Sequence, residues 1–203
     1  MRTIAQGVLA VVLSVMGSSV WAFSLERYVE GVHYEKVAGA ERKPDTVMEF
    51  FSFGCPHCNH LEPLVEKWLK TKPEAVQFTR VPAAWNPRFK VLAKLYYVIV
   101  ALGIEDKAVP AVFDYLHKQN QVIDGRASAW AALSGLEVKE ADFAKAWEDE
   151  QVETKANTAG RIYGQYQIRG VPAMVVNGQY KTSVKMAGSQ NELFEVINFL
   201  LTK

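Results

Sequence analysis

The chain has 203 residues, of which 49% are hydrophobic and 22% are charged, so it is long enough for one domain with an insertion or for two small domains. Its 23 basic and 22 acidic side chains nearly balance and form no block of Lys or Arg, which argues against nucleic acid as a partner. Only two cysteines are present, Cys55 and Cys58, so the fold must be held together by its hydrophobic core.

The first 22 residues have the pattern of a secretory signal peptide. Arg2 is followed by an apolar stretch, Ile4–Met16, and then by small residues that end at Ala22. An uncleaved membrane anchor is the alternative, but the apolar stretch is shorter than the ~20 residues that a spanning helix needs. We therefore expect residues 1–22 to be removed on export. Removal takes away one basic residue, Arg2, and leaves 22 basic and 22 acidic side chains.

A strand, a turn and a helix are predicted around the two cysteines. Segment Val47–Phe53 is apolar on both faces, as expected of a central strand that is covered by helices on each side. Gly54 allows the chain to turn out of the strand. Apolar residues then recur at helical spacing from Leu61 to Leu69, so we expect a helix to begin close to Cys55. The cysteines are therefore placed at the N-terminus of a helix.

The flanking segments complete a small mixed sheet. A short edge strand is expected within 23–39 and a second core strand over 76–81. Strand patterns return at 172–176 and 179–181, separated by an Asn-Gly pair that is typical of a hairpin turn. The sequence Ser-Gln-Asn-Glu at 189–192 is a capping box that opens a final helix.

Between these strands the pattern is helical. From Pro87 to about Gly160 the apolar residues follow helical spacing in five successive segments, and Gly103 is placed to end the first of them. The order of elements predicts a mixed α/β sheet with helices on both sides, interrupted by a helical subdomain. We assign 23–85 and 161–203 to one discontinuous domain and 86–160 to the helical insertion.

Cys55 is the candidate nucleophile. At a helix N-terminus, unpaired backbone N–H groups and the positive end of the helix dipole favour an anion, and only the thiolate form of cysteine attacks a disulfide. His57 adds a donor beside this sulfur, whereas Cys58, one turn later, should face inward. A lowered pKa stabilises the reduced form, which makes the Cys55–Cys58 disulfide a strong oxidant.

A zinc site is the alternative interpretation of the Cys-x-x-Cys motif. No second cysteine pair exists, and His57 and His60 are too few further ligands at the right spacing. We therefore expect redox chemistry, with no metal and no cofactor. Export together with a single Cys-x-x-Cys indicates an oxidising compartment and activity on other proteins.

Three further residues are candidates for a supporting role. Glu49 is ionisable in an apolar strand, and burial would raise its pKa and suit it to accept a proton from Cys58. The alternative is an edge position with the carboxylate in water. Glu62 and Arg80 could pair near the site.

The Val171–Pro172 bond, judged from its spacing alone, would be an ordinary trans bond at the start of an edge strand.

With these motifs in place, the chain resembles the DsbA family of periplasmic thiol:disulfide oxidoreductases. The resemblance rests on Phe51–Cys58, with Cys-Pro-His-Cys, and on Arg169–Ala173, with Gly-Val-Pro. Further matching stretches are Val37–Ala40, Ala101–Lys107 and Val175–Tyr180. The resemblance implies a thioredoxin fold with a helical insertion and the activity of a protein disulfide oxidase.

The resemblance also implies roles for individual residues. Cys55, Pro56, His57 and Cys58 would form the redox centre, with His57 as the main stabiliser of the Cys55 thiolate. Glu49 would be the buried acid near Cys58. Pro172 would be cis and lie beside both sulfurs, and the Val171 backbone would pair with an extended substrate.

Localisation and partners are implied in the same way. The protein would be a periplasmic monomer that oxidises reduced, newly exported proteins and is recharged by a quinone-linked membrane oxidase similar to DsbB. Gly54, where the family often has an aromatic residue, is a departure that affects expected partner contacts. Two rival functions stay open: a reductase or isomerase that keeps the site reduced, and a periplasmic chaperone or metal-binding module without turnover.

Overall fold

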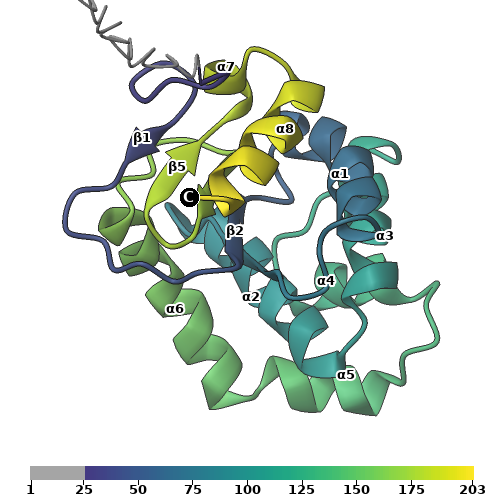
Figure 1. Ribbon diagram of the computed structural model, residues 1–203. Helices are drawn as coiled ribbons and strands as arrows, with labels where there is room; N and C mark the ends of the chain where they lie inside the picture. The colour runs from purple at the N-terminus through teal and green to yellow at the C-terminus, as the bar shows by residue number, and fades with distance from the viewer. Residues whose placement is uncertain (1–25) are drawn as a thin grey trace, which may run out of the picture.

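The structure is a computed structural model that describes residues 26–203 (Figure 1). The predicted signal peptide, residues 1–22, lies outside the described residues. Within 26–203, none of the helices combines the length and the apolar character that crossing a membrane requires. The elements in chain order are β1 (Glu35–Lys36), β2 (Thr46–Phe51), α1 (Pro56–Leu69), β3 (Gln77–Pro82), α2 (Pro87–Leu102), α3 (Glu105–His117), α4 (Arg126–Leu133), α5 (Glu140–Trp147), α6 (Glu150–Gln165), β4 (Ala173–Val176), β5 (Tyr180–Thr182), α7 (Val184–Ala187) and α8 (Gln190–Leu201).

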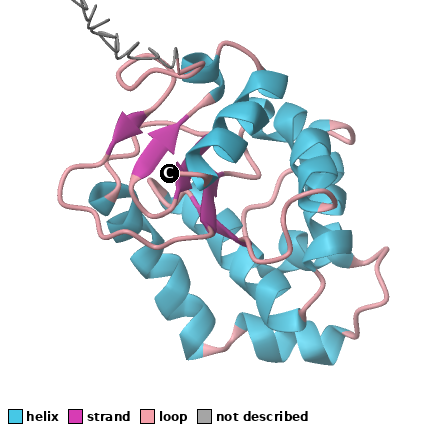
Figure 2. Ribbon diagram, in the orientation of Figure 1, coloured by secondary structure: helices cyan, strands magenta, loops and turns pink. Residues whose placement is uncertain are grey.

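The five strands form one mixed sheet in the order β1-β5-β4-β2-β3. Figure 2 shows strands of this sheet in magenta, surrounded by the cyan helices. Strands β2 and β3 are parallel and are joined through α1, whereas β4 is antiparallel to β2 and β5 is antiparallel to β4. The predicted order of elements is confirmed. The central strand ends at Phe51, two residues before the predicted end, because the next residue, Ser52, begins the turn into α1: its carbonyl oxygen accepts from Cys55 N at 3.1 Å.

The two faces of β2 are covered by different helices, as its sequence predicts. On one face, Val47 belongs to a core cluster with residues of α1 and α8 such as Val65 and Ile197. On the opposite face, Phe50 packs edge-to-face against Tyr163 of α6, with ring centroids 4.9 Å apart. Figure 1 shows α8 in front of the sheet and α6 below β1 and β5. The sheet is therefore the middle layer of the molecule.

Helices α2 to α6 form the helical insertion, much of which occupies the lower half of Figure 1. Gly103 ends α2 in the left-handed conformation, with φ 65°, as predicted. Phe51 and Phe53 pack against Tyr96 of α2 and Phe113 of α3, with centroids 5.2 Å apart in both pairs. The core of the insertion is therefore continuous with the end of β2 that precedes Cys55.

The predicted boundary at residue 160 falls inside α6, which continues to Gln165. The last turn of α6 is fixed to the sheet, because the Tyr163 hydroxyl lies 3.2 Å from the carbonyl oxygen of Phe51 and 3.0 Å from that of Val81. One helix thus belongs partly to the insertion and partly to the layer over the sheet. The division into 23–85, 86–160 and 161–203 stays a prediction.

Two local details near the C-terminus depart from the sequence analysis. Ser189 caps α8 by accepting the Glu192 backbone N–H at 3.1 Å, but the Glu192 carboxylate accepts from Tyr28 at 2.6 Å and from Arg27 at 2.7 Å. The reciprocal half of the capping box is thus replaced by contacts to the N-terminal segment. Helix α7 is absent from the prediction, because four residues are too few to show a helical period.

Candidate active site

Cys55 is the N-cap residue of α1. Its backbone is extended, with φ −97° and ψ 115°, and Pro56 occupies the first turn, where the missing N–H of proline costs nothing. The Cys55 Sγ accepts the backbone N–H of Cys58 at 3.4 Å. Cys55 is partly exposed, His57 is exposed beside it, and Cys58 is buried at 1% relative exposure. The predicted placement of the two sulfurs, one accessible and one inward, is confirmed.

The two thiols, both free in this structure, have opposite acidity. A hydrogen bond from the Cys58 side chain lowers the pKa of Cys55 to about 6, helped by the N–H groups of Cys58 and His57 and by the charge of His57, against the effect of burial. Burial strongly raises the pKa of Cys58, and its hydrogen bond to Cys55 adds to the effect. At neutral pH the arrangement therefore favours a Cys55 thiolate next to a Cys58 thiol.

The Val171–Pro172 peptide bond is cis, as the resemblance implies and contrary to the trans bond expected from spacing alone. Strand β4 begins at the next residue, Ala173, which is paired with Phe50 of β2. This pairing carries the loop to the cysteines, and the Cys55 thiol, when protonated, can donate to the carbonyl oxygen of Val171 at 3.6 Å. The structure thus brings together the two motifs that are more than a hundred residues apart in sequence.

A groove of about 750 Å³ opens beside this loop. Its walls are His57, the segment 167–173, strand β5 with the following Ser183, helix α7, and single residues of β1 and α8. Its lining is mixed, with apolar Val171, Pro172, Val184 and Met186 among polar and charged side chains. The groove is large enough for a segment of extended peptide.

A buried cluster of charges lies under α1. Glu49 and Arg80 are opposite each other on β2 and β3, and Arg80 Nε donates to Glu49 Oε2 at 2.8 Å. Arg80 Nη2 donates to Glu62 Oε1 of α1 at 2.7 Å. The three residues are 1%, 8% and 5% exposed in the order Glu49, Arg80, Glu62. The predicted Glu62–Arg80 pair is confirmed. The predicted burial of Glu49 is also confirmed, so the alternative, an edge position with the Glu49 carboxylate in water, is wrong.

This cluster holds two carboxylates for one guanidinium, which sets its protonation. Burial raises the pKa of Glu62 to about 8, although Arg80 opposes the shift. Burial disfavours the charge on Arg80, but Glu49 and Glu62 outweigh it and raise the Arg80 pKa. At neutral pH the cluster can therefore hold a proton on Glu62. The negative charge of Glu49 also contributes to the raised pKa of Cys58.

His117 contacts the active-site loop and was not found by sequence reasoning. Its Nε2 lies 2.7 Å from the carbonyl oxygen of Phe53, two residues before Cys55. Since a carbonyl only accepts, Nε2 must carry the hydrogen. A lone histidine at the end of a helix gives no signal of such a contact in the sequence. His60, in contrast, is exposed on α1.

Gly54 lies where packing leaves little room for a side chain. A Cβ at this position would come within 3.1 Å of Leu92 Cδ1 and 3.7 Å of Ser52 Oγ. Cys55 N donates to the carbonyl oxygen of Ser52 at 3.1 Å, which closes the turn between β2 and α1. Gly54, where the resemblance leads one to expect an aromatic residue, thus lies at a point where α2 closely approaches the turn.

Comparisons with known proteins agree with this geometry. The family model described as a DSBA-like thioredoxin domain matches residues 74–194. The thiol:disulfide interchange protein DsbA of Burkholderia cepacia is 38% identical over 157 residues, which cover 76% of this chain and 73% of that protein. The chain belongs to the DsbA family. The corresponding protein of Azotobacter vinelandii is 34% identical over 155 residues, covering 76% of this chain and 72% of the relative.

Solved DsbA structures share the fold. The crystal structure of Pseudomonas aeruginosa DsbA matches with a TM-score of 0.81 and 27% identity, over 86% of this chain and 93% of that one. A complex of Proteus mirabilis DsbA with a non-covalently bound peptide matches with a TM-score of 0.73 and 27% identity, over 86% and 98%. The predicted fold class, a thioredoxin fold with an inserted helical subdomain, is confirmed. As a DsbA family member, the protein is a thiol:disulfide oxidoreductase.

Proposed function

We propose that this DsbA family member oxidises reduced proteins through a mixed disulfide at Cys55. A substrate thiolate attacks Cys55 Sγ in the Cys55–Cys58 disulfide, and Cys58 leaves with the bonding electron pair. A second substrate thiolate then attacks the substrate sulfur of the mixed disulfide and releases Cys55 as a thiolate. The substrate dithiol loses two electrons, and the enzyme gains them as its reduced pair.

The observation that carries this proposal is the position of Cys55 Sγ at the N-terminus of α1. The Cys58 N–H points to it, and the surroundings lower its pKa to about 6. A group that leaves as a stable thiolate leaves readily, so the second step favours release of Cys55 and formation of the substrate disulfide. The same stabilisation of the reduced state makes the enzyme an oxidant and disfavours the reductase alternative.

The other predicted residues have supporting roles in this proposal. Buried Cys58 must gain a proton after it leaves, and Glu49 with Glu62 and Arg80 forms the ionisable cluster that could exchange that proton on the inner side of the site. On the outer side, the Val171 backbone and Pro172 border the groove. An extended substrate segment could lie there with its cysteine against Cys55, and a bound peptide in the Proteus mirabilis relative supports such binding.

The expected setting is the periplasm. The signal-like sequence at residues 1–22 and the family relationship support export, and newly exported proteins with reduced cysteines are the proposed substrates. A quinone-linked membrane oxidase similar to DsbB would restore the disulfide. We propose that the protein acts as a monomer.

Single cysteine variants test the order of the steps. Cys58→Ser keeps Cys55, the sulfur that forms the mixed disulfide, but removes the internal thiol that would resolve it, so this variant should accumulate disulfide adducts with substrate that a reductant cleaves. Cys55→Ser should neither form adducts nor oxidise substrate. The measurement is non-reducing electrophoresis with mass spectrometry after reaction with a peptide that carries a glutathionyl disulfide. Equal adducts on both variants would contradict the assignment of Cys55 as the nucleophile.

Equilibration with glutathione separates an oxidase from a reductase. If the protein is an oxidase, it should stay largely reduced in glutathione buffers in which an ordinary protein disulfide persists. A reductase has a low reduction potential, so its disulfide would persist and the protein would be largely oxidised in the same buffers. Alkylation of the free thiols, followed by mass measurement, gives the reduced fraction at each glutathione ratio.

A further inference from the structure

The groove beside Cys55 has an unbalanced set of charges. Its lining contains the basic residues Arg169, Lys181 and Lys185 and also His57, but only one acidic residue, Glu35. The remaining polar lining residues are neutral amides and hydroxyls. The whole chain, in contrast, carries 23 basic and 22 acidic side chains. The groove is therefore a local concentration of positive charge on a nearly neutral protein.

The single acidic residue in the groove is already neutralised. Glu35 of β1 pairs with Lys181 of the adjacent strand β5, with Oε2 and Nζ 2.9 Å apart. Arg169 and Lys185 are exposed, and within residues 26–203 neither has a carboxylate oxygen within 4.0 Å. Residues 1–25 contain no Asp or Glu that could supply one. Two cations in the groove thus lack an acidic partner in the chain.

These cations lie beside the apolar part of the groove. Arg169 shortly precedes the cis bond at Pro172, and Lys185 lies on α7 between Val184 and Met186, all of which line the same groove. An extended peptide in the groove would place some side chains against the apolar residues and others within reach of a cation. Long side chains such as Arg and Lys can follow a bound carboxylate without a change of backbone.

We propose that the groove selects cysteine-containing segments that carry acidic side chains close to the cysteine, through Arg169 and Lys185. This inference rests on the proposed function, because it concerns which segments reach Cys55. The attacking substrate species is itself an anion, and a positive groove also favours its approach. Positive potential in a cleft raises the local concentration and the association rate of negatively charged ligands, and salt weakens the effect.

Two peptides test the charge preference. They share one pair of cysteines and one length, and they differ only in having Asp or Lys at the positions that flank the cysteines. The oxidised full-length protein reacts with each, and stopped-flow fluorescence gives the second-order rate constants. We expect the Asp peptide to react about five- to tenfold faster at low ionic strength, an effect of the size produced by steering in a charged cleft. The ratio should approach one at about 1 M salt, where screening acts over ~3 Å.

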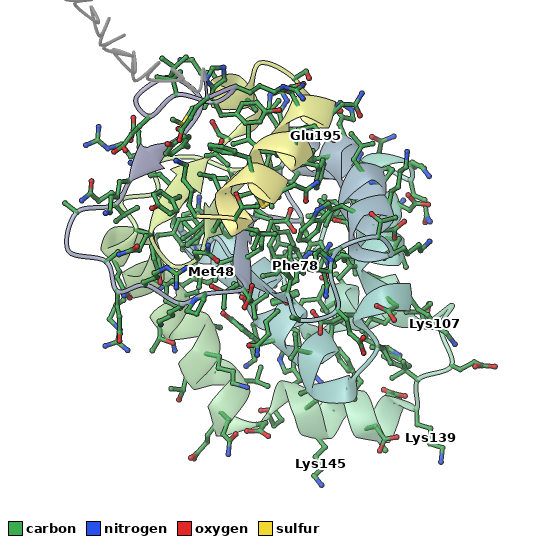
Figure 3. The ribbon with its side chains drawn as sticks, viewed as in Figure 1. Met48, Phe78, Lys107, Lys139, Lys145 and Glu195 are labelled. Carbon is green, nitrogen blue, oxygen red and sulfur yellow. The ribbon has the colours of Figure 1, made fainter. Side chains whose placement is uncertain are left out.

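Matched charge variants locate the effect. The Arg169→Gln/Lys185→Gln double variant should bring the Asp-to-Lys peptide ratio to within about twofold of one, because the one lysine then left in the groove, Lys181, is already paired with Glu35. The control is Lys139→Gln/Lys145→Gln, which removes the same net charge from two exposed residues of the helical insertion. Figure 3 shows both control side chains at the lower end of the molecule, pointing outward. The control should keep the wild-type ratio.

Each outcome bears on one of the two proposals. Equal rates for both peptides with the wild-type protein, or a ratio that falls equally in the control variant, would overturn the charge preference and leave the oxidase intact. If neither peptide and no small neutral dithiol is oxidised, the proposed function itself fails. The salt dependence of the wild-type ratio decides the question even if the groove variant does not fold.

Discussion

At the residue scale, the chemistry depends on how differently two neighbouring sulfurs are surrounded. Cys55 is the N-cap of α1, where a backbone N–H reaches its sulfur, whereas Cys58 is buried one turn later. The same helix carries Glu62, which completes a buried cluster with Arg80 and Glu49. Solvent exposure and local hydrogen-bond donors therefore set the protonation of each group.

Arg80 is the only cation of this cluster, so its removal should be costly. Arg80→Met leaves two buried carboxylates without a partner, and we expect the free energy of unfolding to fall by about 3–5 kcal/mol. Arg80→Lys keeps the charge but contacts fewer oxygens, and it should recover part of the loss. Urea unfolding of both variants measures the difference. A loss below about 1 kcal/mol in Arg80→Met would show that the cluster does not depend on its cation.

The acidity of Cys55 also predicts how the stability of the reduced protein depends on pH. Its pKa is lowered to about 6 from 9.0, so the unfolded chain binds more protons between these values, and the contribution to stability grows as the pH rises from 6 to 9. Glu62 acts in the opposite direction, because its pKa is raised to about 8 from 4.5, and its contribution is lost as the pH rises towards 8.

The Cys55→Ser variant separates these two effects, since it retains Glu62. The difference in unfolding free energy between reduced wild type and Cys55→Ser, measured in urea under reducing conditions, should be larger at pH 8.5 than at pH 6. A difference that is constant across this range would mean that Cys55 is not acidic in the folded protein.

At the scale of single elements, local chemistry decides most of what the sequence could predict. Asn177 and Gly178 have φ 50° and 67°, both positive as the Asn-Gly turn requires, and Gln179 N closes the turn by donating to the Val176 carbonyl at 3.1 Å, so the motif predicts the turn directly. The position of the Glu192 carboxylate depends on contacts with a distant segment, so no local pattern could show it. Helix α7 has four residues, too few to show a helical period. The same limit applies to the mixed composition of the groove, which is assembled from segments far apart in the sequence.

Gly178 combines a left-handed backbone with a close approach. A Cβ there would lie 2.6 Å from the carbonyl oxygen of Glu41, so Gly178→Ala should lower the free energy of unfolding by about 1–3 kcal/mol. The matched control is Gly160→Ala on the exposed side of α6, where nothing lies within 4 Å. That change should stabilise the helix by about 0.5–1 kcal/mol. Urea unfolding of both variants is the test, and equal effects would contradict it.

At the scale of the whole molecule, the helical insertion and the sheet meet at the segment before Cys55. Phe53 packs against Phe113 of α3, and His117 at the end of α3 donates to the Phe53 carbonyl at 2.7 Å. The helical block could be predicted from its periodicity, but its contact with the active-site turn could not, because the two parts are 64 residues apart. Family resemblance supplied the cis Pro172 for the same reason, since spacing alone favoured a trans bond.

His117 therefore connects the insertion to the redox site. His117→Ala leaves the Phe53 carbonyl without this donor and should lower the free energy of unfolding by about 1 kcal/mol, while His117→Gln, which keeps an N–H donor, should lose less. If the contact also positions the turn, the Cys55 thiolate should titrate at a higher pH in His117→Ala than in His117→Gln. Identical titration of both variants would limit the contact to stability.

The most direct test of the account is the titration of Cys55 in the reduced protein. Thiolate absorbance near 240 nm, followed from acid to alkaline pH with Cys55→Ser as the blank, reports the ionisation of this sulfur. We predict a midpoint near pH 6 for Cys55, well below the pH at which Cys58 ionises, because burial raises the pKa of Cys58. A midpoint near 9, the ordinary value of a free thiol, would contradict the claim that the start of α1 stabilises the thiolate and makes the disulfide an oxidant.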